Sequence, residues 1–551
     1  MVQYENMQEQ LKKDLEKVIE QEFNLNIDVE ILTTDDKFGD YKSNIAFKIA
    51  QIQHKNPQDI AQVIKDSLKK YKIVPLNGFI NIWIDNKDLE KYLKSNKLIK
   101  KIKDKNKILI DYSSPNIAKP MNVSHLLSTI IGDSIFRIYK YIGFDIESDN
   151  HIGDWGTQFG KLIYAIDKWG DYKEIQKTPI ETLLKLYIEF HKREETDNII
   201  KDEAKKYFKL LSNKDERLTQ IWKDCLNWSI KDFQRIYKIL DINKFTYTIG
   251  ESFYNDLAQD IVKESLKNNI AKIENGSVVI YTPGNKKPLV IQKSDKTTVY
   301  ATRDIATIKY RQDVLHKNII LYEIGSDQKN VINQMFAASR ILKITKKDTQ
   351  LVLISHGLLK LKGNIKLSTR KGVLVLAEDV INTSLDRAKN IMGKNGITDD
   401  KLIRDIAIGA IKFNILKKHY ATDITFDIDQ MLQLNGDTSV YVQYTYVRCF
   451  SILKNQVFDL SNIKLNNIDE INLARKIYKF EDTIYASKLS PNILSIYLLQ
   501  LSKEFNGFYE KNNILKEKGI VKNTRIALTY KTHSIIKTGL NLLGINTVNK
   551  M

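Results

Sequence analysis

Cysteine and proline are scarce in this chain. It contains two cysteines among 551 residues, Cys225 and Cys449, which lie far apart in the sequence. No CxxC motif is present, so neither a disulfide framework nor a zinc site is indicated, and we expect a reducing compartment. The 8 prolines and 23 glycines are too few for long disordered linkers.

Long apolar runs are also missing. No window approaches about 18 uncharged apolar residues, so we expect no membrane-spanning helix. The N-terminal stretch MVQYENMQEQLKKDLEKVIEQEF is amphipathic and rich in glutamate, unlike a signal or transit peptide. The sequence therefore predicts a cytoplasmic protein without a membrane partner.

Positive charge and apolar residues are abundant. The net charge of +19 favours a polyanionic partner, with nucleic acid ahead of a membrane surface. A general bias towards lysine, isoleucine and asparagine explains the charge equally well, so charge alone leaves both interpretations open. The 42% hydrophobic residues are enough for well-packed globular folding. A chain of 551 residues is too long for one core, so we expect three or four domains.

Hydrophobic spacing predicts a small α+β domain over residues 1–105. Leu11, Leu15, Val18 and Phe23 recur at helical spacing, and GDYKSNIAFKIAQ is expected to form a second helix. GFINIWI alternates like a strand. The lysine-rich run KSNKLIKKIKDKNK then connects this domain to the next.

Residues 106–385 predict a Rossmann-like α/β domain with a parallel, doubly wound sheet, because strand candidates alternate with helices. A mainly helical insertion is expected over about 160–290, and helical spacing over 386–551 predicts an all-α bundle. The strand candidates of the α/β domain are KILIDYSS (starting at Lys107), FDIESD, TVYATRDIA, NIILYEIGS and DTQLVLISHGLL.

The segment PNIAKPMNVSH, residues 115–125, joins the first of these strands to a helix. In open α/β sheets, ligands bind beyond the carboxyl ends of the strands. A helix start there is expected to offer free backbone N–H groups and a positive dipole end, which suits phosphate. Lys119 and His125 would add donors. Taken alone, the segment fits an ordinary proline-rich turn with a surface lysine better than a phosphate site.

A second basic segment, KLSTRKG, follows the last predicted strand of the sheet. Lys366, Arg370 and Lys371 flank two hydroxyl residues, and Gly363 and Gly372 would allow movement. Such a loop can close over a pyrophosphate and neutralise charge that develops during phosphoryl displacement. An isolated basic loop is usually only solvated, but its position after the first segment, on the same sheet, favours a shared site.

Together these segments resemble the arginyl-tRNA synthetases, a family of class I aminoacyl-tRNA synthetases. The signature segment would be Asn122-Val123-Ser124-His125 after SSPNIAKP, and KLSTRKG would be the mobile lysine loop. HIGDWGTQFG, YATRDIA and YVQYTYVRCFSIL are also similar to stretches of this family. The resemblance runs from GDYKSNIAFKIA to GLNLLGI and so covers essentially the whole chain.

The resemblance implies a two-step reaction of an arginine–tRNA ligase. The carboxylate of L-arginine attacks the α-phosphate of ATP, giving arginyl-adenylate and pyrophosphate. The arginyl group then passes to the 3′-terminal adenosine of tRNA(Arg), releasing AMP. Mg²⁺ is expected to accompany ATP, with no structural metal and no permanently bound cofactor. A monomer is expected.

The resemblance also assigns candidate residues. The catalytic set that grips the phosphates would be Lys119, His125, Lys366 and Lys371. The ATP site would consist of Asn122, Val123, Ser124, His125, Gly357, Lys366 and Arg370. A guanidinium substrate needs carboxylate or amide oxygens around its donors. The arginine pocket would consist of Asp111, Asn116, Trp155, Tyr300, Asp304 and Gln328. Asp304 is the best candidate for the ion pair with the guanidinium, and Asp111 and Asn116 would hold the α-amino or carboxylate end. The tRNA contacts would be Phe79 and Asn81 near the N-terminus and Tyr441 and Tyr444 in the bundle.

Two signature positions depart from the family pattern. Asn122 stands where the family has histidine, and Ser124 stands where it has glycine. A Cβ and hydroxyl at residue 124 are expected to push the adenine outwards and weaken ATP binding. Other replacements are Thr369 for the second lysine of the loop, Val331 and Tyr446 for histidines, and Val548 for a proline.

These departures keep two alternatives open. One is a non-catalytic RNA-binding paralogue with a decayed nucleotide site, against which the retained Lys119, His125, Lys366 and Lys371 weigh. The other is a class I relative that uses another amino acid. The carboxylates at Asp111 and Asp304 and the absence of a zinc-type cysteine cluster weigh against this second alternative.

Overall fold

The computed structural model describes residues 7–34, 38–361, 375–394, 396–457 and 459–551. It divides into two compact units. The first unit comprises Met1–Asp104, Tyr141–Gly143 and Gln433–Met551, and the second comprises Lys105–Lys140 and Phe144–Leu432. The basic segment KLSTRKG lies outside the described residues, and with it the predicted site residues Lys366, Arg370 and Lys371.

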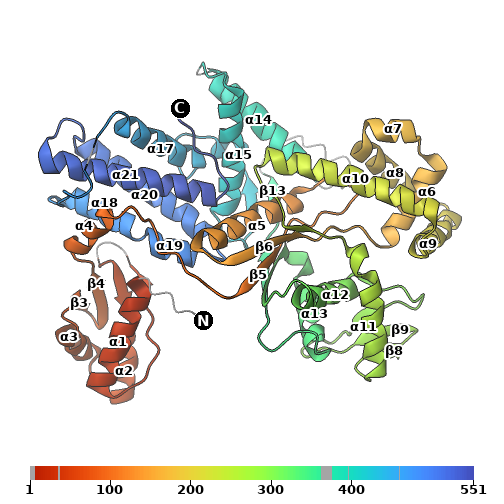
Figure 1. The fold of residues 1–551 in the computed structure, drawn as a ribbon, viewed down its shortest axis with the longest axis horizontal. Coiled ribbons are helices and arrows are strands. Elements are labelled where there is room, and N and C mark those ends of the chain that lie inside the picture. The colour runs from red at the N-terminus through yellow and green to blue at the C-terminus, as the bar shows by residue number, and fades with distance from the viewer. Residues whose placement is uncertain (1–6, 35–37, 362–374, 395, 458) are drawn as a thin grey trace. The chain divides into compact units, whose positions relative to one another are not determined.

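The N-terminal part of the first unit is α+β, as predicted (Figure 1). Its antiparallel sheet has the strand order β1-β2-β4-β3. The helix predicted over GDYKSNIAFKIAQ begins late: Tyr41 and Ser43 are buried in strand β2, and the helix starts only at Ile45. The elements are α1 (Met7–Phe23), β1 (Leu32–Thr33), β2 (Tyr41–Ser43), α2 (Ile45–Gln53), α3 (Pro57–Ser67), β3 (Lys72–Leu76), β4 (Phe79–Trp83) and α4 (Asn86–Lys94).

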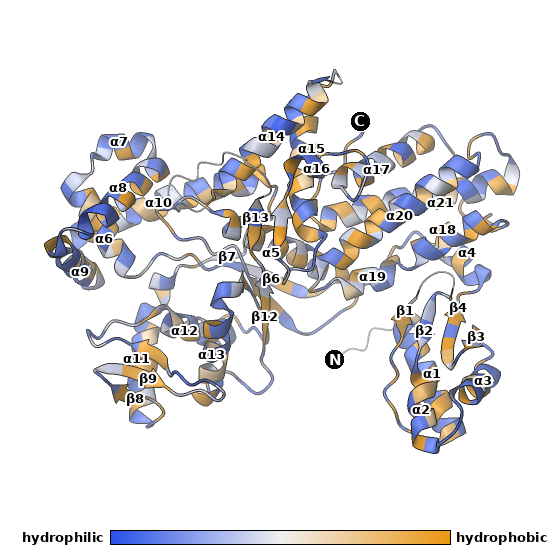
Figure 2. Cartoon of the chain, turned by 180° about the vertical axis from the view of Figure 1, so that it is seen from behind, coloured by the Kyte–Doolittle hydropathy of each residue, from blue (hydrophilic) through white to orange (hydrophobic). Residues whose placement is uncertain are grey.

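The C-terminal part of the first unit is the predicted helical bundle. Apolar residues recur along its helices (Figure 2), and in α20 the buried Leu494, Leu498, Leu501, Phe505 and Phe508 follow helical spacing. The helices are α17 (Ser439–Leu453), α18 (Ile468–Tyr478), α19 (Phe480–Ala486), α20 (Pro491–Lys511) and α21 (Gly519–Leu542).

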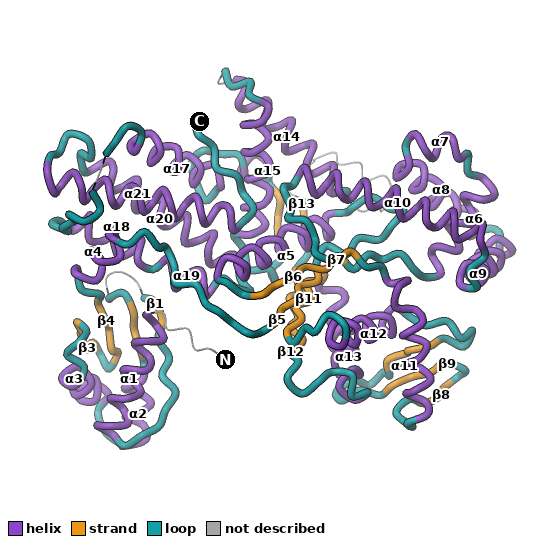
Figure 3. The backbone as a smooth tube through the Cα atoms, viewed as in Figure 1, coloured by secondary structure: helices purple, strands orange, loops and turns teal. Residues whose placement is uncertain are grey.

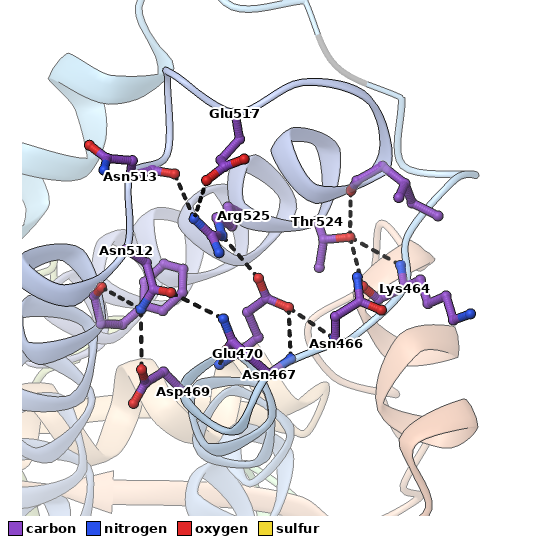
Figure 4. A network of polar contacts seen from close by, with 12 residues as sticks. Lys464, Asn466, Asn467, Asp469, Glu470, Asn512, Asn513, Glu517, Thr524 and Arg525 are labelled. Atoms are coloured by element: carbon purple, nitrogen blue, oxygen red, sulfur yellow. Dashed lines mark hydrogen bonds and ion pairs between the residues drawn. The ribbon is translucent and has the colours of Figure 1, made fainter.

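A buried ion pair ties the start of α18 to α21 (Figure 4). Arg525 Nε donates to Glu470 Oε1 over 2.9 Å, and Glu470 Oε2 accepts from the backbone of Asn466 over 3.0 Å. Asn467 caps the same helix, because its Oδ1 accepts from the Glu470 backbone at 2.8 Å. Arg525 also donates to the carbonyl of Asn513, so one guanidinium joins three segments of the bundle.

The second unit contains the predicted parallel sheet, with strand order β12-β11-β5-β6-β7. Every neighbouring pair in this sheet is parallel. Its strands are β5 (Lys107–Asp111), β6 (Asp145–Asn150), β7 (Tyr247–Thr248), β11 (Ile319–Gly325) and β12 (Gln350–His356).

Helices cover both faces of this sheet (Figures 1 and 3). Helix α5 (Val123–Ile142) lies on one face, and α12 (Tyr300–Asp313) and α13 (Lys329–Ile341) lie on the other. Leu109, Ile320 and Tyr322 of the sheet share one core with residues of α12 and α13. This doubly wound arrangement places the turns after β5, β6 and β11 at one edge.

The strand predicted over TVYATRDIA is wrong, because these residues begin helix α12. The β-branched run before Tyr300 suggested a strand. Ala301, Ile305 and Ile308 are buried at positions i, i+4 and i+7, which only a helix places on one face. Tertiary burial outweighs the local β preference here.

The insertion is mainly helical, as predicted, but it ends in an antiparallel sheet of order β10-β9-β8 that the sequence pattern did not indicate. Its elements are α6 (Thr157–Trp169), α7 (Tyr172–Lys177), α8 (Pro179–Glu194), α9 (Asn198–Ser212), α10 (Glu216–Ile239), the 3₁₀ helix η1 (Glu251–Tyr254), α11 (Asn255–Lys267), β8 (Lys272–Glu274), β9 (Ser277–Ile280) and β10 (Leu289–Gln292).

The second unit continues to Leu432, whereas the sequence places the end of the α/β domain at residue 385. The division into compact units does not test this domain boundary, which stays a prediction. Beyond this point it includes a strand, β14, paired in parallel with β13. The remaining elements are η2 (Ser326–Gln328), β13 (Leu359–Leu361), α14 (Ala377–Lys394), α15 (Asp400–Leu416), β14 (Ile424–Phe426) and α16 (Ile428–Met431). Within the described residues, no helix is long and apolar enough to cross a membrane.

Candidate active site

A cavity of about 600 Å³ opens at the carboxyl edge of the parallel sheet. Asp111 ends β5, His151 follows β6 and Ile324 lies near the end of β11, and all three line the cavity. The cavity therefore occupies the place where ligands bind in open α/β sheets.

All six residues predicted for the arginine pocket line this cavity, although they come from distant parts of the chain. They are Asp111, Asn116, Trp155, Tyr300, Asp304 and Gln328. Sequence reasoning missed other charged or titratable residues of the same lining, among them His151, Glu251, Lys293 and Arg303. His151 opens HIGDWGTQFG, a stretch recognised as similar to the family without a role for its histidine. The substrate contacts of the six residues stay predictions.

The wall formed by β5 and β6 holds a fully buried guanidinium. Nη2 of Arg311 donates to Asp111 Oδ2 at 2.6 Å and to Asp149 Oδ2 at 2.7 Å. The other oxygen of Asp111 accepts from the Ser114 hydroxyl at 2.9 Å. Burial raises the pKa of Asp149, although the charge of Arg311 opposes this shift. The charge of Asp111 is therefore already compensated before any ligand binds.

The other two cavity carboxylates differ from each other. Glu251 is paired with Arg303, whose Nε and Nη2 lie 2.9 and 2.7 Å from its Oε2. Asp304 lies instead beside the imidazole of His151, with 3.3 Å between His151 Nε2 and Asp304 Oδ1. Among the three carboxylates that line the cavity in the described chain, Asp304 alone has no arginine or lysine partner. It is the carboxylate best placed to accept a guanidinium from a ligand.

The turn before α5 departs from the prediction of free N–H groups. Oδ1 of Asn122 accepts from the backbone N–H groups of Ser124 and His125, at 2.9 and 3.1 Å. The N–H of Val123 donates to the carbonyl of Val375 at 3.0 Å. Asn122 is thus the N-cap of this helix, and the prediction of free N–H groups at these three positions is wrong. The positive end of the helix dipole still points at this edge.

His125, predicted as a donor to phosphate, is a neutral side chain. Its Nδ1 accepts from the backbone of Asn122 at 3.2 Å. Burial, together with the charges of His356 and Lys119, lowers the pKa of His125 to about 4. The ring therefore carries its proton on Nε2 at neutral pH and can donate one hydrogen bond without carrying charge.

Lys119 is held by the insertion. Its Nζ donates to Oε1 of Gln158 in α6 at 2.9 Å and lies 4.1 Å from the ring centroid of Tyr187 in α8. Burial lowers the pKa of Lys119. Gln158 also lines the cavity, so the ammonium lies near its rim. Sequence reasoning identified the lysine but neither of its partners, because their contact depends on how the insertion folds back.

Ser124 belongs to a polar chain at the ends of β11 and β12. Its Oγ lies 3.1 Å from Nε2 of His356, and Nδ1 of His356 lies 2.7 Å from Glu323 Oε1. Burial lowers the pKa of His356, but Glu323 more than offsets this effect and raises it. His356, which sequence reasoning missed, is therefore a candidate cation beside the signature. A Cβ at Gly357 would lie 2.6 Å from the Thr422 carbonyl, which gives this glycine a packing role.

The four predicted tRNA contacts lie in the first unit. Phe79 is exposed and packs edge-on against Phe47, whereas Asn81 is buried and donates to the Val74 carbonyl at 3.3 Å. Tyr441 and Tyr444 in α17 are partly exposed. Their hydroxyls accept from Asn506 and Arg448, each at 3.0 Å. No RNA contact of these residues is tested, and their roles stay predictions.

Comparison with known proteins agrees with this architecture. Residues 88–428 match the family described as tRNA synthetases class I (R), catalytic domain, residues 442–551 match the DALR anticodon binding domain, and residues 5–84 match the arginyl tRNA synthetase N terminal domain. The parallel sheet, its insertion and the cavity at its carboxyl edge thus define a class I aminoacyl-tRNA synthetase.

The more particular assignment comes from full-length relatives. Arginine–tRNA ligase of Clostridium botulinum is 35% identical over 98% of this chain and 100% of the relative. The arginine–tRNA ligase of Fusobacterium nucleatum is 37% identical over 94% of this chain and 95% of the relative. Plasmodium falciparum arginyl-tRNA synthetase superposes with a TM-score of 0.85 at 27% identity, with both chains fully covered. The chain belongs to the arginyl-tRNA synthetase family.

The predicted family, fold class and activity are confirmed. The protein is an arginine–tRNA ligase whose substrates are ATP, arginine and tRNA. Thermus thermophilus arginyl-tRNA synthetase has the same fold, with a TM-score of 0.83 at 20% identity over 99% of this chain and 100% of that one. The alternatives of a non-catalytic paralogue and of a class I relative for another amino acid are not favoured.

Proposed function

We propose that the cavity holds L-arginine with its guanidinium against Asp304. The observation that carries this proposal is that Asp304 lacks a cationic partner of the lysine or arginine type, while Asp111 and Glu251 already have one. Tyr300, half exposed one turn earlier in α12, flanks the same end of the cavity. Asn116, on the turn after β5, would hold the α-amino or carboxylate end.

ATP is proposed to bind beside arginine, as its magnesium complex, at the start of α5. Lys119 and the neutral His125 would donate to the phosphates, and phosphate oxygens would supply most of the magnesium ligands. The described chain resumes at Val375, four positions after Lys371, and there accepts the hydrogen bond of Val123. Lys366, Arg370 and Lys371, which lie outside the described residues, are proposed from the family resemblance to contact the same phosphates.

The chemistry needs placement more than a reactive side chain. The arginine carboxylate must approach the α-phosphate although both are anions. Cationic and hydrogen-bonding groups around the phosphates would lower this repulsion and stabilise the charge that builds up at phosphorus. The adenylate then meets the terminal adenosine of tRNA(Arg), whose hydroxyl displaces AMP. Roles for Phe79, Asn81, Tyr441 and Tyr444 in holding this tRNA are part of the same proposal.

A monomer in the cytoplasm is also proposed. Both cysteines are buried and unpaired, which fits a reducing compartment. Sedimentation equilibrium of the purified chain tests the oligomeric state, and a monomer would give a mass of 63.9 kDa.

Replacing Lys119 with methionine tests the phosphate site. We expect kcat/KM for ATP in ATP–pyrophosphate exchange, measured with tRNA present, to fall by about 10- to 150-fold, because one charge-assisted hydrogen bond contributes about 1.5–3 kcal/mol. Lys185→Met is the matched control, since Lys185 lies on the surface of α8 and pairs with Glu181 there. Equal exchange by the two variants would exclude Lys119 from the phosphate site.

Replacing Ser124 with glycine tests the steric prediction from the signature. We expect KM for ATP to fall by about two- to fivefold, equivalent to about 0.5–1 kcal/mol, because the base could then approach the backbone. Ser124→Ala removes the contact with His356 but keeps the Cβ. If the alanine variant gains as much affinity as the glycine variant, the hydroxyl rather than the Cβ is responsible. Unchanged or weaker ATP binding by Ser124→Gly would contradict the prediction.

A further inference from the structure

His151 is a cavity neighbour of Asp304 that neither the sequence analysis nor the proposed substrate contacts explain. It follows β6, lines the cavity and lies partly buried beside the ring of Tyr254, with 5.5 Å between centroids. Its Nε2 lies 3.3 Å from Asp304 Oδ1. Within the described residues, neither ring nitrogen has a hydrogen-bond partner of good geometry. The imidazole is therefore held against Asp304 by charge and packing alone.

The surroundings of His151 are strongly acidic. Burial lowers the pKa of His151, but the contact with Asp304 and the negative charge of Asp111 more than offset this effect and raise it to about 9. The imidazole is therefore protonated at neutral pH in the empty pocket. The charged groups that interact with it are the carboxylates of Asp111, Asp149, Asp154, Glu251 and Asp304 and the guanidinium of Arg311. The ring of Tyr254 packs beside it, and Arg303 pairs with Glu251.

Arginine binding would place a second cation against the same carboxylate. A guanidinium keeps its charge at any physiological pH. A like charge a few ångströms away disfavours the protonated form of an imidazole, most strongly where both are buried. The guanidinium of the substrate cannot lose its proton. Either His151 therefore loses its own proton, or two cations lie against the same carboxylate.

We propose that His151 is a positioning residue that releases its proton to solvent when the guanidinium of arginine binds to Asp304. In the empty pocket, the imidazolium compensates Asp304 and holds it in place. In the complex, the neutral ring leaves the carboxylate to the substrate. An uncharged analogue such as L-citrulline cannot replace the lost positive charge, so the exchange also selects for a cationic side chain.

This inference rests on the proposed arginine site and predicts a measurable proton balance. Calorimetric titration of the full chain with L-arginine at pH 8, in two buffers of different ionisation enthalpy, is expected to show release of about one proton per arginine bound. His151→Gln keeps a side chain that can contact Asp304 but cannot titrate, and it should release close to none. Equal proton release by both proteins, or none by the wild type, would overturn the inference.

The pH dependence of KM provides the second readout. Since the free enzyme binds a proton that the complex lacks, affinity for arginine should rise with pH until it levels near the pKa of about 9. KM for arginine in aminoacylation is expected to fall by about five- to tenfold between pH 7.0 and 8.0 in the wild type. It should stay flat in His151→Gln, and parallel profiles would overturn the inference.

The proposed arginine site at Asp304 and the proposed proton release by His151 can be tested separately. If Asp304→Asn leaves KM for arginine unchanged, the proposed arginine site is wrong and this inference falls with it. If Asp304→Asn raises KM but the wild type releases no proton, only the role of His151 is wrong. Should His151→Gln not fold, the proton count of the wild type still decides the question.

Discussion

Replacing Asp304 with asparagine is expected to raise KM for arginine by about 100- to 1000-fold, and Asp304→Lys should abolish arginine use. Truncating one partner of a buried, hydrogen-bonded charge pair costs about 2–5 kcal/mol, and each 1.4 kcal/mol is tenfold in affinity. Asparagine keeps the shape of the side chain, so the effect reports charge. Aminoacylation at saturating ATP and tRNA(Arg), with varied arginine, measures it.

Asp313→Asn is the matched control for this experiment. Asp313 lies on the same helix as Asp304, but it is on the surface, where it pairs with Lys309 and Lys346. Its replacement should change KM by less than about twofold, because exposed ion pairs contribute little. Affinity for tRNA, measured by filter binding, should stay unchanged in all three variants. Unchanged arginine turnover in Asp304→Asn would remove Asp304 from the pocket.

The choice of Asp304 shows what the sequence can and cannot decide. Motif resemblance selected six residues from β5 to η2, and the fold brings all six to one cavity. The resemblance favoured Asp304 over Asp111 as the partner of the guanidinium, but it could not show that Asp111 already has an arginine partner in the fold. That difference depends on Arg311, which lies 200 positions from Asp111 and meets it only after the sheet has formed. An ion pair between residues so far apart in the sequence produces no local sequence pattern from which it could be predicted.

The turn before α5 shows a second limit of prediction from the sequence. The family pattern correctly placed a strand, a turn and a helix around Asn122, because hydrophobic periodicity and turn residues act locally. It could not show that Asn122 caps α5, or that burial makes His125 neutral. In the same turn, Ser113, Ser114 and Ala118 adopt positive φ angles of 74°, 43° and 61°. Such backbone strain is typical of functional sites and is held in place by the surrounding fold.

Replacing Arg311 with methionine is expected to destabilise the second unit by about 3–5 kcal/mol, because it leaves two buried carboxylates without their cation. Its guanidinium is fully buried between Asp111 and Asp149. The melting transition that reports the parallel sheet should shift down by about 6–10 °C in differential scanning calorimetry. Lys309→Met, on the surface of the same helix, should shift it by no more than about 1–2 °C.

The pH dependence of this deficit separates charge from packing. Burial already raises the pKa of Asp149 in the folded protein, and without the charge of Arg311 this pKa rises further above its unfolded value of about 3.9. The folded variant then binds more protons than its unfolded chain, so its stability increases as pH falls. The Tm difference between wild type and Arg311→Met should therefore be larger at pH 8 than at pH 5. A difference that stays constant over this range would mean that lost packing, and not two uncompensated carboxylates, causes the destabilisation.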